Sequence, residues 1–185
     1  MANKVKYGLS QCYYAVATDD GQGNLTYGTP VALKGAVNLS LDAQGESNPF
    51  YADNIVYFQT QSNNGYSGTL ELALIPDSFR TDVLGEVADQ NTVIVEKADA
   101  KTVEFALLFQ FEGDENATRH CMYRCTATRA TVAGQTNEAS ITPQTETLNI
   151  TAMPRITDNI VKSKCSEAQT VQYSAWYTQV YEPSL

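Results

Sequence analysis

Histidine is nearly missing from this chain of 185 residues, because His120 is its only copy. An enzyme that activates a nucleophile with an imidazole base would depend on that one residue. His120 follows Arg119 in a predicted strand, and we interpret it as a surface or rim histidine. The chain also has no GxSxG motif. We therefore predict no catalytic residue and no enzymatic activity.

Cysteine occurs four times, but never with the CxxC spacing of common metal and redox sites. Cys121 and Cys125 lie four residues apart in a predicted strand, which separates their Cα atoms by about 13 Å. A disulfide needs less than about 7 Å, so these two cannot pair with each other. His120 should point to the opposite face from Cys121. We predict reduced thiols that fill the core, no metal site and no cofactor.

Basic charge and long apolar runs are both scarce. The chain has 12 Lys and Arg against 21 Asp and Glu, for a formal net charge of −9. It lacks the basic patch with which proteins grip phosphates, so specific nucleic-acid binding is not expected. A helix that crosses a membrane needs a run of about 18 apolar residues, and the sequence has none. Met1–Tyr7 also lacks the apolar segment of a secretory signal. We expect the protein to stay in a cytoplasm unless a dedicated export system secretes it.

Acidic residues are numerous enough to leave carboxylate chemistry open. The tightest pairs, Asp19-Asp20 and Asp114-Glu115, stand in predicted turns, where carboxylates are ordinarily solvated. A hydrolase with an acidic pair is therefore one alternative, and it needs two carboxylates about 5–10 Å apart in a cleft. The stretch 21–25 lacks the third glycine of a phosphate loop, and the faint calcium-loop pattern from Asp19 has no Glu at its twelfth position. We interpret this stretch as a hairpin turn.

Two segments, Val31–Leu41 and Thr102–Glu112, alternate between apolar and polar residues over eleven positions each. This period is typical of half-buried antiparallel strands. Further predicted strands are 11–18, 55–60, 68–75, 92–97, 119–129, 145–152 and 170–180. A turn at 113–116 predicts a hairpin whose second strand carries Cys121, Tyr123 and Cys125 on one face. The sequence thus predicts a mainly β fold in a single domain over residues 1–185.

One stretch predicts a short helix, over about 77–85. Asp77 is a plausible N-cap, and Gly85 can end the helix in a left-handed conformation. Phe79 and Val83 are four residues apart and would share one face of the helix. We expect that face to cover an open end or edge of a sheet.

A long extended loop is predicted over residues 43–54, after the first alternating strand. It contains Ser, Asn, Gly and Pro, yet its Phe50 and Tyr51 are too apolar for an idle loop tip. Either these two side chains pack against their own domain, or they dock on another chain.

Several short segments in a fixed order along nearly the whole chain carry a resemblance to a known family. They are Lys6–Leu9, Cys12–Ala15, Tyr27–Val37, Phe50–Asn54, Gly68–Ala73, Ile75–Phe79, Asp82–Gly85, Phe105–Asp114 and Arg119–Cys125. Their order and spacing together resemble the major tail proteins of long-tailed, non-contractile bacteriophages, the subunits of the tail tube. None of the segments is a chemical motif by itself.

This resemblance implies an antiparallel β-sandwich or barrel-like tail-tube fold with a flanking helix. Six copies would form a ring with four strands of each lining the bore, and stacked rings would form the conduit for genome delivery. The implied partners are further copies of the chain, the tape measure protein, and the tail terminator and baseplate or tip proteins. DNA would pass through the bore without specific binding, and no membrane would be involved. The implied location is the virion tail, after assembly in the host cytoplasm.

Long loops and terminal arms of such proteins usually bridge one ring to the next. The corresponding parts of this chain would be the loop at 43–54 and the termini, residues 1–7 and 181–185. The candidate inter-ring or inter-subunit contact residues are Tyr7, Glu46, Asn48, Phe50, Tyr51 and Tyr181.

A β-sandwich that binds a ligand or carbohydrate is the second alternative. The chain has 11 Tyr and one Trp, and exposed aromatic side chains of this kind stack on ligands. Trp176 and Tyr173 could equally be core or interface residues. Self-association without glycan binding would exclude this alternative.

Overall fold

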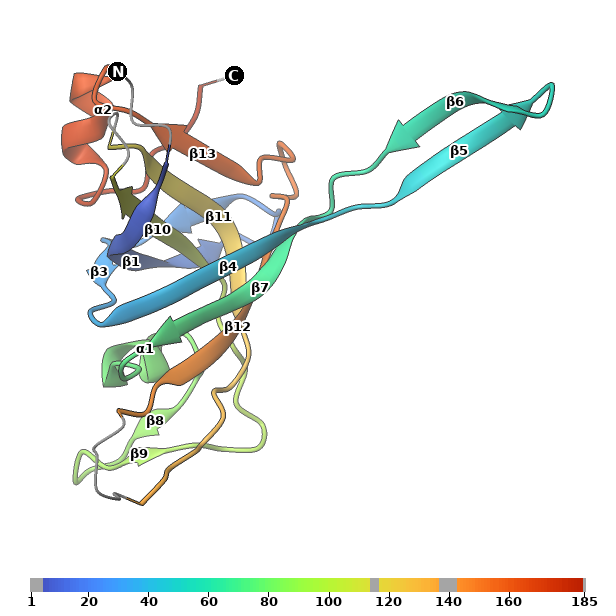
Figure 1. Cartoon of the computed structure of the whole chain (residues 1–185). Coiled ribbons are helices and arrows are strands. Elements are labelled where there is room, and N and C mark those ends of the chain that lie inside the picture. The colour runs from blue at the N-terminus through green and yellow to red at the C-terminus, as the bar shows by residue number, and fades with distance from the viewer. Residues whose placement is uncertain (1–4, 114–116, 137–142, 185) are drawn as a thin grey trace.

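The computed structural model describes residues 5–113, 117–136 and 143–184, which form a curled antiparallel sheet from which a hairpin projects (Figure 1). The strands are β1 (Tyr7–Asp19), β2 (Leu25–Tyr27), β3 (Val31–Ala32), β4 (Ala36–Gln44), β5 (Ser47–Ala52), β6 (Ile55–Gln61), β7 (Gly65–Leu72), β8 (Val87–Ala88), β9 (Ile94–Val95), β10 (Phe105–Glu112), β11 (Arg119–Ala127), β12 (Glu146–Met153) and β13 (Lys162–Cys165). The helices are α1 (Asp77–Asp82) and α2 (Thr170–Ala175). The predicted mainly β class and the short helix predicted over about 77–85 are confirmed, and α2 is a second helix that was not predicted.

The main sheet has nine strands, seven of which follow the antiparallel order β2-β1-β10-β11-β12-β7-β4. β3 pairs with β1, and β13 pairs with the first half of β11. The predicted hairpin of β10 and β11 is confirmed, with Leu108 opposite Cys121. β1 and β4 also contact each other, so the sheet curls toward a barrel.

The larger of two hydrophobic clusters lies on one face of this sheet. Leu70, Phe105 and Ile150 from three strands are buried in it. Helix α1 packs against this cluster, and both Phe79 within the helix and Val83 directly after it are fully buried there. The ring of Phe79 meets that of Phe105 edge-on, with 5.4 Å between centroids. Burial of these rings fixes α1 against the sheet, although Pro76 rather than Asp77 is the N-cap.

The smaller cluster lies on the other face and is covered by the C-terminal part of the chain. Ala106 and Leu108 are buried in it, so β10 is buried on both faces rather than half-buried. The predicted strand at 170–180 is wrong, since α2 begins this segment. Tyr173, Trp176 and Val180 lie three and four residues apart, a helical spacing, and all three contact this cluster. The segment was predicted as a strand because aromatic and β-branched residues are common in strands.

A bulge divides the side chains of β11 between the two clusters. The pairing of β10 with β11 shifts register between Phe105 and Leu107. Cys121 and Tyr123 therefore join the smaller cluster, whereas Cys125 joins the larger one. The prediction that these three residues share one face is wrong, because an extra residue in a strand inverts the alternation beyond it.

The predicted continuous strand at Val31–Leu41 is also divided. Gly35 has a φ of +84° and forms a turn, so β3 pairs with β1 while β4 pairs with β7. Leu33 lies in the gap, buried, with its backbone N–H donating to the carbonyl of Cys12 at 2.8 Å. The alternation of apolar and polar residues does not reveal this turn, because Gly35 occupies one of the alternating apolar positions, between Leu33 and Val37.

Candidate functional site: a projecting two-stranded arm

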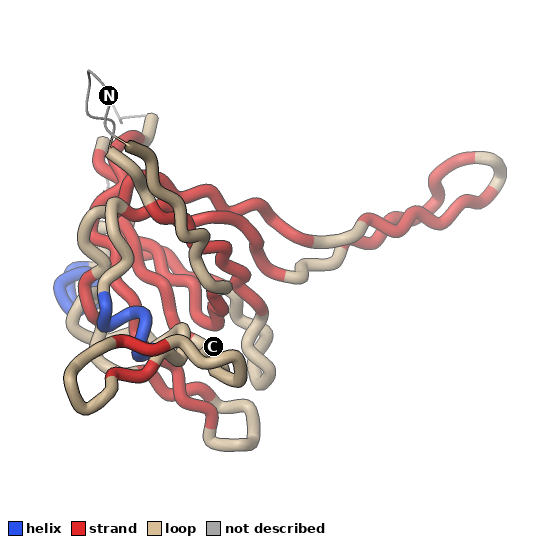
Figure 2. Tube along the Cα trace, turned by 90° about the horizontal axis from the view of Figure 1, so that it is seen from below, coloured by secondary structure: helices blue, strands red, loops and turns tan. Residues whose placement is uncertain are grey.

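The most distinctive feature of the molecule is a two-stranded arm, Ser47–Gln61. β4 and β7 leave the main sheet and continue as β5 and β6, which project away from the body (Figures 1 and 2). Ala52 pairs with Ile55 across a two-residue turn, Asp53-Asn54, in which both residues are left-handed with φ of 52° and 63°. Such a turn is typical of tight hairpins. The prediction of a loop over 43–54 is therefore wrong, because most of these residues are paired strand.

Two glycines form the joint between the arm and the body. A side chain at Gly45 would meet the carbonyl oxygen of Ser62 at 2.1 Å, and one at Gly65, whose φ is +97°, would meet that of Ala152 at 2.0 Å. Between the glycines, the N–H of Ser62 donates to the carbonyl of Glu46 at 2.9 Å, and the Glu46 N–H donates to Ser62 Oγ at 2.8 Å. The joint is closely packed and hydrogen-bonded, so the arm leaves the body in a defined direction.

Apolar side chains cover the arm. Six large ones are exposed to solvent by about half or more: Phe50 (61%), Tyr51 (63%), Ile55 (60%), Val56 (49%), Tyr57 (71%) and Phe58 (60%). Phe50 and Tyr51 therefore do not pack against their own domain. Contiguous apolar surface of this kind marks interaction sites on folded proteins.

The other predicted contact residues lie in three places. Glu46 is exposed at the joint, and Asn48 is exposed on β5, opposite Thr60. Tyr7 is exposed at the start of β1, opposite Glu112. Tyr181 lies far along the chain and is half-buried against the smaller cluster. Of the two predicted terminal segments, residues 1–4 and 185 lie outside the described part of the chain.

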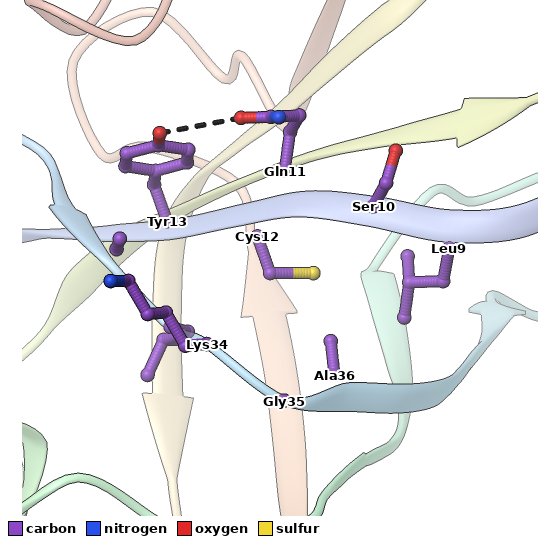
Figure 3. Close-up of a pocket in the computed structure, with 10 residues that line it drawn as sticks. Leu9, Ser10, Gln11, Cys12, Tyr13, Lys34, Gly35 and Ala36 are labelled. Carbon is purple, nitrogen blue, oxygen red and sulfur yellow. Dashed lines mark hydrogen bonds between the residues drawn. The ribbon is translucent and has the colours of Figure 1, made fainter.

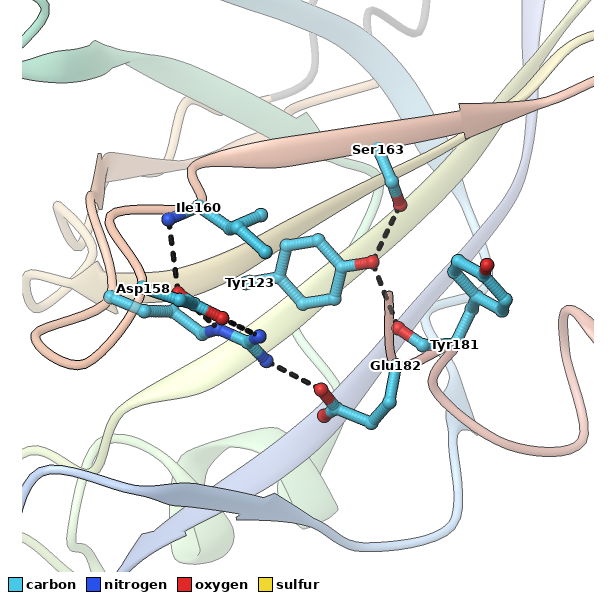
Figure 4. A network of polar contacts seen from close by, with 7 residues as sticks. Tyr123, Asp158, Ile160, Ser163, Tyr181 and Glu182 are labelled. Carbon is cyan, nitrogen blue, oxygen red and sulfur yellow. Dashed lines mark hydrogen bonds and ion pairs between the residues drawn. The ribbon is translucent and has the colours of Figure 1, made fainter. Parts of the chain in front are cut away.

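A polar network holds Tyr181 to its own chain (Figure 4). Its carbonyl accepts a hydrogen bond from Tyr123 Oη at 2.8 Å, and its ring stacks on Trp176 with 5.9 Å between centroids. The next residue, Glu182, accepts a hydrogen bond at 2.7 Å from the buried guanidinium of Arg155. The C-terminal segment is therefore clamped over the smaller cluster at Tyr181 and Glu182.

Arg155 also binds Asp158, with Nε donating to Oδ1 at 3.0 Å. The hydrogen bond from the Arg155 guanidinium lowers the pKa of the Asp158 carboxyl. Burial raises the pKa of the Tyr123 hydroxyl, so it stays protonated and able to donate. Arg155 could not be singled out from the residue pattern, because its carboxylate partner Glu182 is 27 residues away.

A cavity of about 380 Å³ lies between β1 and the turn from β3 to β4 (Figure 3). Residues 9–13 and 32–36 line it, including Cys12 and Lys34. Burial raises the pKa of the Cys12 thiol to about 12, so the thiol is not a nucleophile at neutral pH. The lining brings together no acid–base pair with this thiol.

The residues considered for catalysis that lie in the described part of the chain make structural contacts. His120 stacks on Phe109 with 5.1 Å between ring centroids. Asp19 and Asp20 accept hydrogen bonds from backbone N–H groups of the turn that joins β1 to β2. Asp114-Glu115 lies outside the described residues.

All four cysteines are free and buried. Residues 5–113, 117–136 and 143–184 contain no group of three or more His, Cys, Asp or Glu side chains that could hold a metal ion. In the same ranges, no helix is both long and apolar enough to cross a membrane.

The fold and the arm define a mainly β protein whose distinctive surface is a projecting hairpin with exposed apolar side chains. The sequence profile of the family described as phage tail tube protein matches residues 2–182. The chain therefore belongs to the phage tail tube protein family, and the resemblance seen in the sequence is confirmed. It is a structural protein of the virion tail that assembles into the tail tube. No curated protein matches this chain.

Proposed function

We propose that this chain forms hexameric rings that stack into the tail tube, and that the arm joins one ring to the next. The observation that carries the proposal is the exposed apolar surface of the arm. An isolated two-stranded hairpin is marginally stable in water. Its apolar side chains stabilise it through the hydrophobic effect only when a partner covers them. The arm is thus a segment whose stable state is a bound state.

The ribbon of β4 and β7 has unlike ends, which suits stacking. The arm extends from the Gln44 and Gly65 end. Toward the other end, Val37 and Leu74 are exposed apolar residues, about 23 Å from Gln44 and about 30 Å from Gly65 respectively at 3.3 Å per residue. A contact between unlike ends of identical subunits repeats in one direction, and repetition along an axis produces a stack.

The charge of the chain supports a conduit for DNA. A formal net charge of −9 keeps phosphates away from the wall rather than binding them. This repulsion acts over about 8 Å at physiological salt. In this proposal DNA passes through the bore without specific binding. The tape measure protein and the terminator and baseplate or tip proteins are the further partners, and subunits assemble in the host cytoplasm.

The test replaces the arm and leaves the body intact. Glu46 and Ser62 already form a hydrogen-bonded pair, so residues 47–61 can be exchanged for Asn-Gly, which closes a tight hairpin at that pair. We expect the variant to fold, with an unchanged melting temperature for the body, and to form no tubes in negative-stain images. Val132→Ser, a polar change at an exposed residue outside the arm, is the control that should form tubes. Normal tubes from the armless variant would refute the bridging role.

The alternative of a carbohydrate-binding module loses its main aromatic candidate. Trp176 is only 2% exposed and packs in the smaller cluster, so its ring is not available to stack on a sugar. Tyr173 is engaged as well, because the Arg119 guanidinium lies 3.6 Å from its ring centroid. Both side chains hold the C-terminal segment in place.

A further inference from the structure

Residues 166–184 of the C-terminal segment, here called the strap, lie as a separate layer over one face of the main sheet. The sheet contributes small or flat apolar side chains to the contact, among them Ala15, Ala106 and Leu108, which have no exposed surface. The strap contributes larger side chains that complete the smaller cluster, namely Tyr173, Trp176, Tyr177, Val180 and Tyr181. This apolar face of the sheet is therefore buried beneath the strap.

The strap lies on the sheet without pairing to it as a strand. Its backbone hydrogen bonds are local, such as those from the Tyr173 N–H to the Gln169 carbonyl at 2.8 Å and from the Thr178 N–H to the Ala175 carbonyl at 2.9 Å. In the described part of the chain, the hydrogen bonds between the strap and the sheet each involve a side chain. A strand must break a ladder of backbone bonds to leave a sheet, whereas the strap needs only to release side chains.

Helix α2, at the centre of the strap, is not stable by itself. It has six residues, no side-chain hydrogen bond at its N-cap and no buried residue of its own. Helix α1 has the same length but buries Phe79 completely in the larger cluster. Isolated helices shorter than about 12–15 residues are marginal in water. Helix α2 should therefore persist only while Trp176, which follows it and is buried, stays seated on the sheet.

An arginine of the sheet holds the first end of the strap. The guanidinium of Arg119, on β11, lies 3.6 Å from the ring centroid of Tyr173 and 4.7 Å from that of Tyr177. Its Nε donates to Gln110 Oε1 at 3.2 Å, and the Tyr177 hydroxyl donates to the same oxygen at 3.3 Å. Cation–π contacts and shared hydrogen bonds thus fasten two strap residues to the ends of β10 and β11.

A second arginine holds the far end of the strap. Arg155 Nη1 donates to Glu182 Oε2 at 2.7 Å, and the Tyr123 hydroxyl donates to the Tyr181 carbonyl beside it (Figure 4). The Glu182 side chain is already half exposed, so water can solvate it when this pair separates. Arg155 then keeps Asp158 as its partner. Release of this end therefore leaves no unpaired charge in the interior.

We infer that the strap opens and closes on the sheet as one unit, while the sheet and the larger cluster stay folded. Segments that lack backbone hydrogen bonds to their surroundings open at a lower free energy than the core. The closed strap hides an apolar face of the sheet, and the open strap uncovers it, so the strap is a lid over that face. This inference goes beyond the proposed tube, because it concerns the single subunit.

The native cysteines report this opening without any substitution. Cys121 lies beneath the strap in the smaller cluster, whereas Cys125, four residues further along β11, lies in the larger cluster. Both are fully buried, and burial raises the pKa of each thiol, so neither reacts before its cover opens. Unassembled subunits are treated with iodoacetamide, and mass spectrometry of their peptides measures the label on each cysteine. We expect Cys121 to be alkylated at least about tenfold faster than Cys125.

Reciprocal variants separate the two clusters. Arg119→Leu removes one fastener of the strap, so it should speed up the alkylation of Cys121 at least about fivefold and leave that of Cys125 unchanged. Phe79→Leu loosens the larger cluster, so it should speed up Cys125 and leave Cys121 unchanged. Arg129→Leu, at an exposed ion pair outside the strap, is the control that should change neither rate.

Urea provides a second measurement on the natural chain, which also decides the matter if Arg119→Leu fails to fold. Opening of the strap exposes less surface than unfolding, so the alkylation rate of Cys121 should rise less steeply with urea than that of Cys125. Equal rates with equal dependence on urea would overturn the inference, because the strap would then open only when the whole subunit unfolds. Acceleration of both thiols to the same extent by Arg119→Leu would overturn it as well. All measurements use unassembled subunits, so a failure to form tubes contradicts the proposed function and not this inference.

Discussion

Phe50 stands directly opposite Phe58 across the arm, and both rings are exposed to solvent. Phe105, in contrast, has no exposed surface and packs edge-on against Phe79. The same residue type is therefore left exposed on the arm in one place and buried in the core in the other. This contrast allows one substitution to separate the two roles.

We predict that Phe105→Ala lowers the free energy of unfolding by about 3–5 kcal/mol, because it leaves a cavity in the larger cluster. Phe50→Ala should change it by less than about 0.5 kcal/mol, since the side chain is mostly exposed and lies outside both hydrophobic clusters. Urea unfolding of unassembled subunits measures both values. Phe50→Ala should nevertheless impair tube formation in negative-stain images. Equal losses of stability for the two variants would contradict the assignment of Phe50 to an assembly surface.

Leu107→Asp should abolish folding, because it puts an unpaired charge in the larger cluster, where Leu107 is fully buried. Val132→Asp makes the same chemical change at an exposed residue and should fold normally. Circular dichroism and solubility distinguish the two. A soluble Leu107→Asp subunit with a cooperative melting transition would contradict the burial of Leu107 in the larger cluster.

Arg155→Leu should lower the free energy of unfolding by about 2 kcal/mol. The buried guanidinium donates hydrogen bonds to Asp158 and Glu182, which are partly exposed and can be solvated again, so its loss removes these charged hydrogen bonds and frees the C-terminal segment. Arg129→Leu is the matched control, because Arg129 forms an exposed ion pair with Glu96 and should contribute less than about 1 kcal/mol. Urea unfolding at pH 7 measures both variants. Similar effects at the two positions would argue against a clamp at Arg155.

The pairing of Asp158 with Arg155 predicts a dependence of stability on acid pH. Arg155 lowers the pKa of Asp158 in the folded chain below its ordinary value of about 3.9. The resulting stabilisation is present above that ordinary value and is lost as the pH falls through the lowered pKa of the folded state. The difference in stability between the natural chain and Asp158→Asn should therefore be largest at neutral pH and shrink toward pH 2. A difference that stays constant from pH 7 to pH 2 would contradict this pairing.

Gly65→Ala should disturb the joint of the arm. The new Cβ would lie 2.0 Å from the carbonyl oxygen of Ala152, at a φ of +97° that is unfavourable for alanine. We expect a loss of at least 1 kcal/mol of stability together with poor assembly. Gly134→Ala is the control, because nothing lies within 4 Å of its added Cβ. Thermal unfolding and electron microscopy of the two variants test this, and a fully stable Gly65→Ala chain that assembles normally would refute the closely packed joint.

The sequence by itself determined the mainly β class, the β10–β11 hairpin, helix α1 and the family. These follow from local signals: alternation along Phe105–Glu112, the four-residue spacing of Phe79 and Val83, and the order of short segments along the chain. Phe50 and Tyr51 were also identified from sequence as residues too apolar for an idle loop. Local composition is sufficient for such features because they depend on neighbours in the chain.

Only the tertiary structure decided the features that depend on distant residues. The bulge in β11, which sends Cys125 to the other face from Tyr123, arises from pairing with β10 and leaves no mark in residue type. The first strand of the arm, β5, lies in the segment predicted as a loop because of its Ser, Asn, Gly and Pro, whereas the second strand, β6, agrees with the strand predicted over 55–60. Arg155 acquires its role only when the curled sheet brings Glu182 beside it. In each case the physical reason is contact between residues far apart in the chain. Such contacts decide which side chains are buried, which are paired and which stay exposed.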